Sequence, residues 1–131
     1  MIGIDTNILV RHLTRDDPQQ SDVAERFFRT RSSSDPAFVS LVVVTEFCWV
    51  MKKSYAYRNA QICVSFQQLL RSDEFRFEDD DFLTTLFFGP VFRGDIADYV
   101  IAHIANKKGC TKTLTFDQAA AKNIPGMELL A

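Results

Sequence analysis

The chain has 131 residues, of which 47% are hydrophobic and 24% charged, and its formal net charge at pH 7 is −2. This length suits one domain over residues 1–131, and the charge argues against a protein that holds nucleic acid by bulk positive charge. No apolar run is long enough for a membrane span, the first residues lack the pattern of a signal peptide, and the three cysteines follow no metal or disulfide spacing. We therefore expect a cytoplasmic protein with no membrane partner.

The first half of the chain alternates short apolar runs with helical patterns. Such runs predict buried strands, whereas Asp17-Pro18 and Ser40 are typical helix starts. The segment after Ser40 contains VVV, which also suits a strand, but its length and polar spacing favour a helix. The elements expected are a strand at 1–4, a helix at 6–13, a helix from 17, a strand at 37–39, and helices at 41–53 and 58–71.

The second half continues this alternation. A run of acids at 78–81 favours a helix N-terminus, and Gly89-Pro90 and Gly109 are expected to end helices. The elements expected are a strand at 75–78, a helix at 79–88, a helix at 95–108, a strand at 114–116, a helix at 118–122 and an edge strand at 127–130. Strands that alternate with helices predict an α/β domain with a mostly parallel sheet.

Two aspartates directly follow predicted strands. Asp5 ends the first apolar run, and Asp117 follows the run at 114–116. In open α/β sheets the functional crevice lies beyond the carboxyl ends of the strands, so both side chains are expected at that edge. Each also fits the N-cap of a following helix, and Asp117 before QAAAK fits that role especially well.

A glutamate lies within the apolar pattern of the helix at 41–53. On a helix, the neighbours of Glu46 three and four positions away are Val42, Val43, Trp49 and Val50, which are all apolar. The pattern therefore predicts that the Glu46 side chain does not lie on a solvated face.

Asp98 repeats this pattern in the helix at 95–108. Ile101, Ala102 and Ala105 lie on its side of the helix, so its side chain is expected to point inward. The alternative is a capping box with Asp95, because the D-x-x-D spacing can mimic a reciprocal cap. Asp95 lies one turn earlier on the same face, and the interpretation as a cap and the interpretation as a functional acid fit it equally well.

Taken together, the four carboxylates would converge on one edge of one sheet. Two like charges about 4 Å apart repel by roughly 4 kcal/mol at an effective dielectric constant near 20, so such a cluster requires cations. Oxygen ligands with no histidine or cysteine nearby favour Mg²⁺ or Mn²⁺ over zinc.

With these residues assembled, the sequence resembles the PIN domain family, and in particular the VapC-type toxins of type II toxin-antitoxin pairs. The resemblance rests on four stretches in this order: IDTNILVRHLTRDDPQQ, SLVVVTEFCWVMKKSY, GDIADYVIA and TLTFDQAA. It implies a PIN-like α/β/α sandwich with a mostly parallel central sheet of four or five strands, and a metal-dependent ribonuclease activity. Gly89-Pro90 departs from the family pattern, because relatives usually have a longer helix there.

The resemblance also implies roles for individual residues. Matched position by position, the catalytic and metal-binding quartet is Asp5, Glu46, Asp98 and Asp117. Asn7 and Thr115 match polar residues that commonly support the first and last acids. Asp95 matches an extra acid in many relatives, either as a direct ligand or as a residue that supports the ligands.

The activity expected from this resemblance is endoribonuclease cleavage. One or two Mg²⁺ or Mn²⁺ ions held by the quartet would activate water, so that the products carry 5′-phosphate and 3′-hydroxyl ends. One alternative is a Mg²⁺-dependent phosphoryl-transfer or phosphatase domain, although D-x-D would then be expected where the chain has Asp5-Thr6-Asn7. Another is a PIN-like module that binds a partner without turnover.

The partners implied are an RNA substrate, a cognate VapB-like antitoxin lying across the acidic groove, and a second copy of the chain in a homodimer. Six cations near the acid-bearing segments are candidates for contacts with RNA phosphates, with ordinary surface cations as the alternative interpretation. These candidates are Arg11, Arg15, Lys52, Lys53, Arg58 and Arg93. No base-recognition motif indicates which RNA is cut.

Overall fold

The computed structural model describes residues 1–130, which fall into two compact units. Unit 1 is Met1–Phe92, and unit 2 is Arg93–Ala131, of which residues 93–130 are described. Each unit is considered by itself below. A single domain over residues 1–131 stays a prediction, and its last residue lies outside the described part of the chain.

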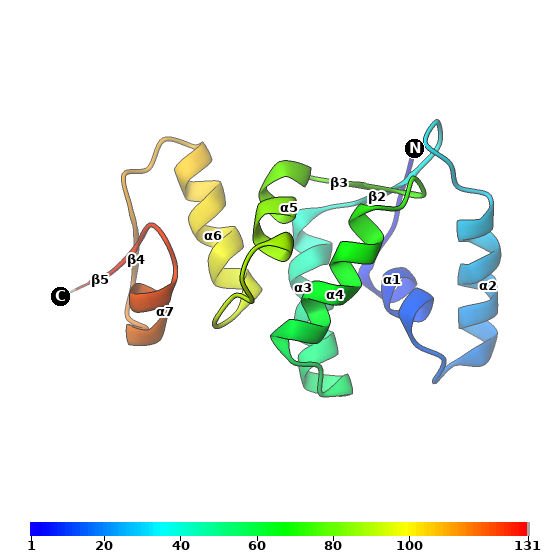
Figure 1. Ribbon diagram of the computed structural model, residues 1–131, viewed down its shortest axis with the longest axis horizontal. Coiled ribbons are helices and arrows are strands. Elements are labelled where there is room, and N and C mark those ends of the chain that lie inside the picture. The colour runs from blue at the N-terminus through cyan, green and yellow to red at the C-terminus, as the bar shows by residue number, and fades with distance from the viewer. Residues whose placement is uncertain (131) are drawn as a thin grey trace. The chain divides into compact units, whose positions relative to one another are not determined.

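Unit 1 contains three short parallel strands and the helices that connect them (Figure 1). The elements in chain order are β1 (Ile2–Gly3), α1 (Thr6–Leu13), α2 (Pro18–Arg29), β2 (Ala37–Val39), α3 (Leu41–Tyr55), α4 (Asn59–Leu70), β3 (Phe75–Phe77) and α5 (Asp80–Phe88). The strand order is β1-β2-β3, with Ile2 opposite Ala37 and Ala37 opposite Phe75. Every strand and helix expected from the sequence in this unit is present.

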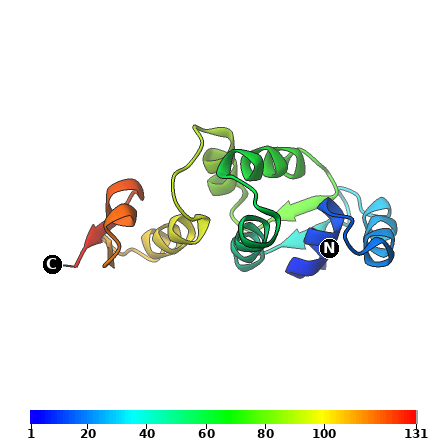
Figure 2. The ribbon, with the colours of Figure 1, turned by 90° about the horizontal axis from the view of Figure 1, so that it is seen from below.

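Helices flank the small sheet of unit 1. Helix α4 packs on β3 and on α5, and α1 packs between α2 and α3. Figure 2 shows the strands of this unit with α4 and α5 on one side of them. The α/β class, with parallel strands covered by helices, is therefore confirmed.

An aromatic cluster fills the core of unit 1. Phe47, Phe66 and Phe87 are fully buried. The rings of Phe66 and Phe87 stack with centroids 4.4 Å apart, and Phe47 meets Phe66 edge-on at 5.5 Å. Because these rings come from α3, α4 and α5, their burial holds the three helices together.

Unit 2 contains one pair of parallel strands within its described residues. Its elements are α6 (Ile96–Lys107), β4 (Thr113–Thr115), α7 (Gln118–Asn123) and β5 (Met127–Leu129). Strands β4 and β5 pair with Thr113 opposite Met127. All five expected strands are thus present, but within residues 1–130 they form a three-stranded and a two-stranded sheet, where the sequence predicted one central sheet.

Local signals in the sequence fix most helix ends. Asp17 and Ser40 cap α2 and α3, accepting hydrogen bonds from the backbone N–H groups of Gln20 at 3.1 Å and Val43 at 3.2 Å. Helix α5 ends at Phe88, before Gly89-Pro90 as predicted. A side chain at position 89 would lie 2.9 Å from the Thr85 carbonyl oxygen, so glycine suits this close turn. Within residues 1–130, every helix is too short or too polar to cross a bilayer.

Candidate functional site

Asp5 lies where β1 ends and α1 begins. Its carboxylate oxygen Oδ1 accepts a hydrogen bond from the backbone N–H of Ile8 at 3.3 Å, so the N-cap role expected as an alternative is present. The side chain is exposed and borders a cavity of about 900 Å³ in unit 1, which Asn7 and Arg11 also line. Capping engages one oxygen of the carboxylate, so it does not exclude a second role for this residue.

Glu46 lies on the exposed side of α3, contrary to the prediction that its face is not solvated. The buried face of this helix is formed by other residues: Leu41, Val44, Phe47, Cys48 and Met51. The neighbours Val42 and Trp49 are 76% and 58% exposed. Helix α3 therefore carries apolar residues on two faces, and only one of these faces packs on the core of unit 1.

Two aspartates of unit 2 act on a third. Asp95 is the N-cap residue of α6 but makes no side-chain capping hydrogen bond, and Asp98 lies in the first turn of that helix. Burial raises the pKa of Asp98 above its usual range, and the negative charges of Asp95 and Asp117 raise that pKa further. The Asp98 side chain is half-buried, so the prediction that it points inward holds in part.

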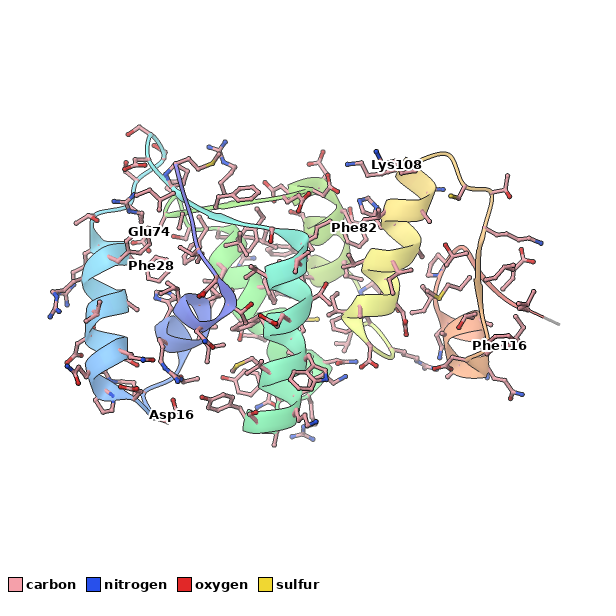
Figure 3. All side chains as sticks on the ribbon, turned by 180° about the vertical axis from the view of Figure 1, so that it is seen from behind. Asp16, Phe28, Glu74, Phe82, Lys108 and Phe116 are labelled. Carbon is pink, nitrogen blue, oxygen red and sulfur yellow. The ribbon has the colours of Figure 1, made fainter. Side chains whose placement is uncertain are left out.

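Asp117 follows β4 and caps α7. Its Oδ1 accepts from the Ala120 N–H at 3.0 Å, and its own N–H donates to the Thr115 hydroxyl oxygen at 3.0 Å. Thr115 thus bonds to the backbone beside Asp117, and its role in supporting the last acid stays a prediction. Between them lies Phe116, whose side chain is 81% exposed and is labelled in Figure 3.

The two units contribute the predicted acids separately. Asp5 and Glu46 belong to unit 1, and Asp95, Asp98 and Asp117 belong to unit 2. Among residues 1–130, no three histidine, cysteine, aspartate or glutamate side chains are grouped so as to hold a metal ion. The charges of Asp95 and Asp117 act on the Asp98 carboxyl group, whereas convergence of all four predicted acids stays a prediction.

Two of the candidate RNA-binding arginines have partners within the protein. The Arg11 side chain is 23% exposed, and it donates to Gln20 Oε1 at 2.8 Å and to Asp16 Oδ1 at 3.1 Å. Arg15 forms an ion pair with Asp22 at 2.6 Å. Arg11 is therefore held in a structural network, and Arg15 would have to exchange a partner to bind phosphate.

The remaining cationic candidates lie in the later helices and at the start of unit 2. Lys53 lies over the indole ring of Trp49, with Nζ 4.7 Å from the ring centroid. Lys52 is half-buried, while Arg58 and Arg93 are exposed. Their contact with RNA stays a prediction.

A hydrogen-bond network around Asp16 was not predicted from the sequence. The hydroxyl of Tyr55 donates to Asp16 Oδ2 at 2.5 Å, and that of Thr14 donates to Oδ1 at 3.1 Å. The Tyr55 hydrogen bond is the main cause of an Asp16 pKa below its usual range. This network joins the loop between α1 and α2, where Figure 3 labels Asp16, to the last residue of α3.

Comparison with known proteins identifies one family. The model of the PIN domain family matches residues 2–124. No curated protein matches the chain. The match spans both units and includes every acid discussed above.

Proposed function

Because the chain belongs to the PIN domain family, we propose that it is a metal-dependent endoribonuclease that acts as the VapC-type toxin of a type II toxin-antitoxin pair. PIN domains are in general metal-dependent nucleases, so membership supports a hydrolase that acts on nucleic acid. The family match over residues 2–124 carries the proposal. Asp5, Glu46, Asp98 and Asp117 are the proposed catalytic and metal-binding acids.

The chemistry of unit 2 fits a divalent cation. The pKa of Asp98 is raised by burial and by two neighbouring aspartates, as expected for carboxylates that repel one another until a cation neutralises them. Oxygen ligands of this kind suit Mg²⁺ or Mn²⁺. When bound, one or two such ions would lower the pKa of a water molecule and offset the charge that develops on the phosphate.

The protein's own residues have separate tasks in this proposal. The four acids would hold the cation, and Asp95 would support them or bind it directly. The Thr115 hydroxyl accepts from the Asp117 N–H and so orients the turn that presents this carboxylate. Asn7, exposed beside Asp5 at the same cavity, is the corresponding residue in unit 1.

The proposed partners follow from the toxin assignment. A VapB-like antitoxin would cover the acids, and a cationic side chain of that antitoxin would take the place of the metal charge. The proposal also includes a homodimer and a cytoplasmic location. Purification of the chain co-expressed with the neighbouring small gene product would test the antitoxin, and sedimentation of the isolated chain as a monomer at micromolar concentration would count against the homodimer.

The test of the activity is RNA cleavage by the purified chain with Mg²⁺, with Mn²⁺ and with EDTA. We expect cleavage only with metal, with 5′-phosphate and 3′-hydroxyl ends. Asp98→Asn and Glu46→Gln should each reduce the rate by about a hundredfold or more, as is typical for loss of a catalytic group.

A matched control for these variants is Asp73→Asn, because Asp73 is an exposed acid of unit 1 outside the proposed site. This variant should cleave RNA at the wild-type rate. Cyclic 2′,3′-phosphate products would contradict the proposed use of water. Metal-dependent RNA binding without cleavage would instead indicate the binding module considered above, and no observation favours the phosphatase alternative.

A further inference from the structure

The outer face of α3 carries a line of side chains that the core of unit 1 does not use. Val42, Glu46, Trp49 and Lys53 follow one another at helical spacing, and all four are exposed. Trp49 is the only tryptophan of the chain and is 58% exposed. The opposite face of the same helix supplies the buried residues, so packing within unit 1 does not explain the tryptophan.

The indole ring of Trp49 has a cation beside it. Lys53 Nζ lies 4.7 Å from the ring centroid, in the range of a cation–π contact. This contact orients the lysine on a ring that remains more than half exposed. An aromatic surface with an adjacent ammonium group has the two features needed to hold single-stranded nucleic acid, namely a platform for a base and a charge for a phosphate.

We propose that Trp49 and Lys53 form a subsite for single-stranded RNA, in which the indole stacks on a base and the ammonium group contacts the adjoining phosphate. The proposal rests on the proposed function. Glu46 precedes Trp49 by one helical turn, and side chains at that spacing have Cβ atoms about 5–6 Å apart. The stacked base would therefore lie next to the phosphodiester that is cut, which makes Trp49 a positioning residue.

Charge along α3 favours RNA over an apolar protein partner. Lys52 and Lys53 lie at the end of the helix beyond Trp49, and Glu46 lies before it. A phosphate is attracted toward the lysine end and repelled from the glutamate, which gives the bound strand a direction. The other occupant to consider is a second copy of the chain, for which Val42 and Trp49 would be an apolar contact.

One of two other cation–π pairs provides a control. The Arg71 guanidinium lies 4.8 Å from the centroid of the Phe88 ring, and that of Arg31 lies 4.6 Å from Phe27. Phe88 is 39% exposed and belongs to α5, which carries none of the proposed catalytic acids. Phe88→Ala removes an exposed ring with a cationic neighbour and should leave RNA binding unchanged.

The single tryptophan makes the test direct. The full chain is titrated in EDTA with an unlabelled oligouridylate while tryptophan fluorescence is recorded, because EDTA prevents turnover. We expect the emission to be quenched as the base stacks, and to be unaffected by an abasic ribose-phosphate oligomer of the same length. Binding of a fluorescein-labelled oligouridylate, followed by anisotropy, provides the affinity.

The variants separate stacking from charge. Trp49→Ala should weaken binding by about fivefold to a hundredfold, the range for loss of one stacking side chain, and Trp49→Phe should recover part of this loss. Lys53→Gln should reduce the slope of the logarithm of affinity against the logarithm of salt concentration by about 0.7, the value for one phosphate of a single strand. Lys53→Arg should retain the slope. Circular dichroism checks that each variant is folded.

Several results would contradict the proposed RNA subsite. These are absence of binding, binding without quenching, and equal weakening by Trp49→Ala and Phe88→Ala. Sedimentation in which Trp49→Ala converts a dimer to a monomer, with RNA binding unchanged, would assign the face to a second copy. RNA cleavage by Trp49→Ala at the wild-type rate with Mg²⁺ would contradict the proposed subsite but not the proposed nuclease activity. If wild type binds RNA with quenching of its fluorescence but never cleaves it, the nuclease proposal is wrong and the subsite proposal is not.

Discussion

The apolar cores inside unit 1 and inside unit 2 differ in the size of the side chains that they bury. Unit 1 encloses the rings of Phe47, Phe66 and Phe87. The buried side chains of unit 2 are smaller. Ala102, Ala120, Ile124 and Met127 form a cluster with Tyr99 packed against it, and Ile96 and Val100 are also buried. A segment shorter than roughly 40 residues rarely encloses a sufficient core, so unit 2 has little apolar burial to offset the repulsion among its aspartates.

The difference in buried side chains indicates which physical effect governs each unit. In unit 1 the large buried rings set stability, and the proposed acids Asp5 and Glu46 lie on its exposed surface. In unit 2 the charges of Asp95 and Asp117 act on a half-buried Asp98 beside a small core. We therefore expect changes of side-chain volume to matter most in unit 1 and changes of charge to matter most in unit 2.

The largest expected effect on stability is that of Phe66→Ala in unit 1. Removing a fully buried ring that contacts three others should lower the free energy of unfolding by about 3–5 kcal/mol. The matched change in unit 2 is Phe116→Ala, which removes an 81% exposed ring and should stay within about 0.5 kcal/mol of wild type. Urea denaturation followed by circular dichroism measures both, and equal losses would contradict the comparison.

A smaller effect is expected from the pair Ile62→Val and Ile124→Val, which delete one methyl group from each core. Ile62 is fully buried, so loss of this methyl group should cost about 1 kcal/mol. Ile124 lies in the cluster of smaller side chains, where we expect more of the space to close, so its change should cost less, about 0.5 kcal/mol. Thermal and urea unfolding compare the two, and a larger loss for Ile124→Val would reverse the ranking of the cores.

Acidification should weaken unit 1 through His12. This side chain packs against Phe28, with ring centroids 4.5 Å apart, and burial lowers its pKa although Glu74 and Glu25 act in the opposite direction. Figure 3 labels Phe28 and Glu74 in this region. Because the folded pKa lies below the unfolded value of about 6.5, the unfolded chain binds the proton first, and stability is lost as pH falls below that value.

The measurement for His12 is the free energy of unfolding between pH 7.5 and 5.5. Wild type should lose stability toward pH 5.5, and His12→Phe, which keeps an aromatic ring but has no titratable nitrogen, should lose less. An identical pH dependence in the two proteins would show that His12 does not contribute.

Asp98 should respond to pH in the opposite direction. Its folded pKa is raised, so the native state binds a proton at a pH where the unfolded chain does not, and the metal-free protein gains stability as pH falls through that folded pKa. Asp98→Asn should show this gain already at neutral pH and lose this contribution to the pH dependence, while that of His12 remains. Melting in EDTA from pH 7 to 4.5 tests this, and an Asn variant less stable than wild type at pH 7 would contradict it.

Added Mg²⁺ gives a second comparison between wild type and Asp98→Asn. A cation that binds the native carboxylates should raise the melting temperature of wild type more than that of Asp98→Asn. An equal rise in both proteins would place any bound ion away from Asp98.

Contacts between segments that are distant in the chain could not be predicted from the sequence. The acids at 78–81 predict only a helix N-terminus, yet Glu78 Oε1 accepts from the Leu41 N–H at 2.8 Å and so joins the end of β3 to the start of α3. The hydrogen bond from Tyr55 to Asp16 likewise joins residues 39 positions apart. No local pattern encodes either partner, because the pairing depends on how α3 lies against its neighbours.

The secondary structure follows from neighbouring residues. A cap such as Asp17 or Ser40 bonds to a backbone N–H three residues later, so sequence proximity is sufficient to predict the helix start. The parallel pairing of short strands follows from their alternation with helices. The N-cap interpretations of Asp5 and Asp117 are confirmed for the same local reason.

The choice of face on α3 has a different origin. The helix has apolar residues around most of its circumference, so periodicity predicts an apolar neighbourhood for Glu46 without indicating which side is covered. Packing selects the face that carries Val44, Phe47 and Met51, because these side chains meet the core of unit 1. Glu46 and Trp49 are left exposed on the same helix, since a side chain's burial depends on which segments pack against it and not on its neighbours along the chain.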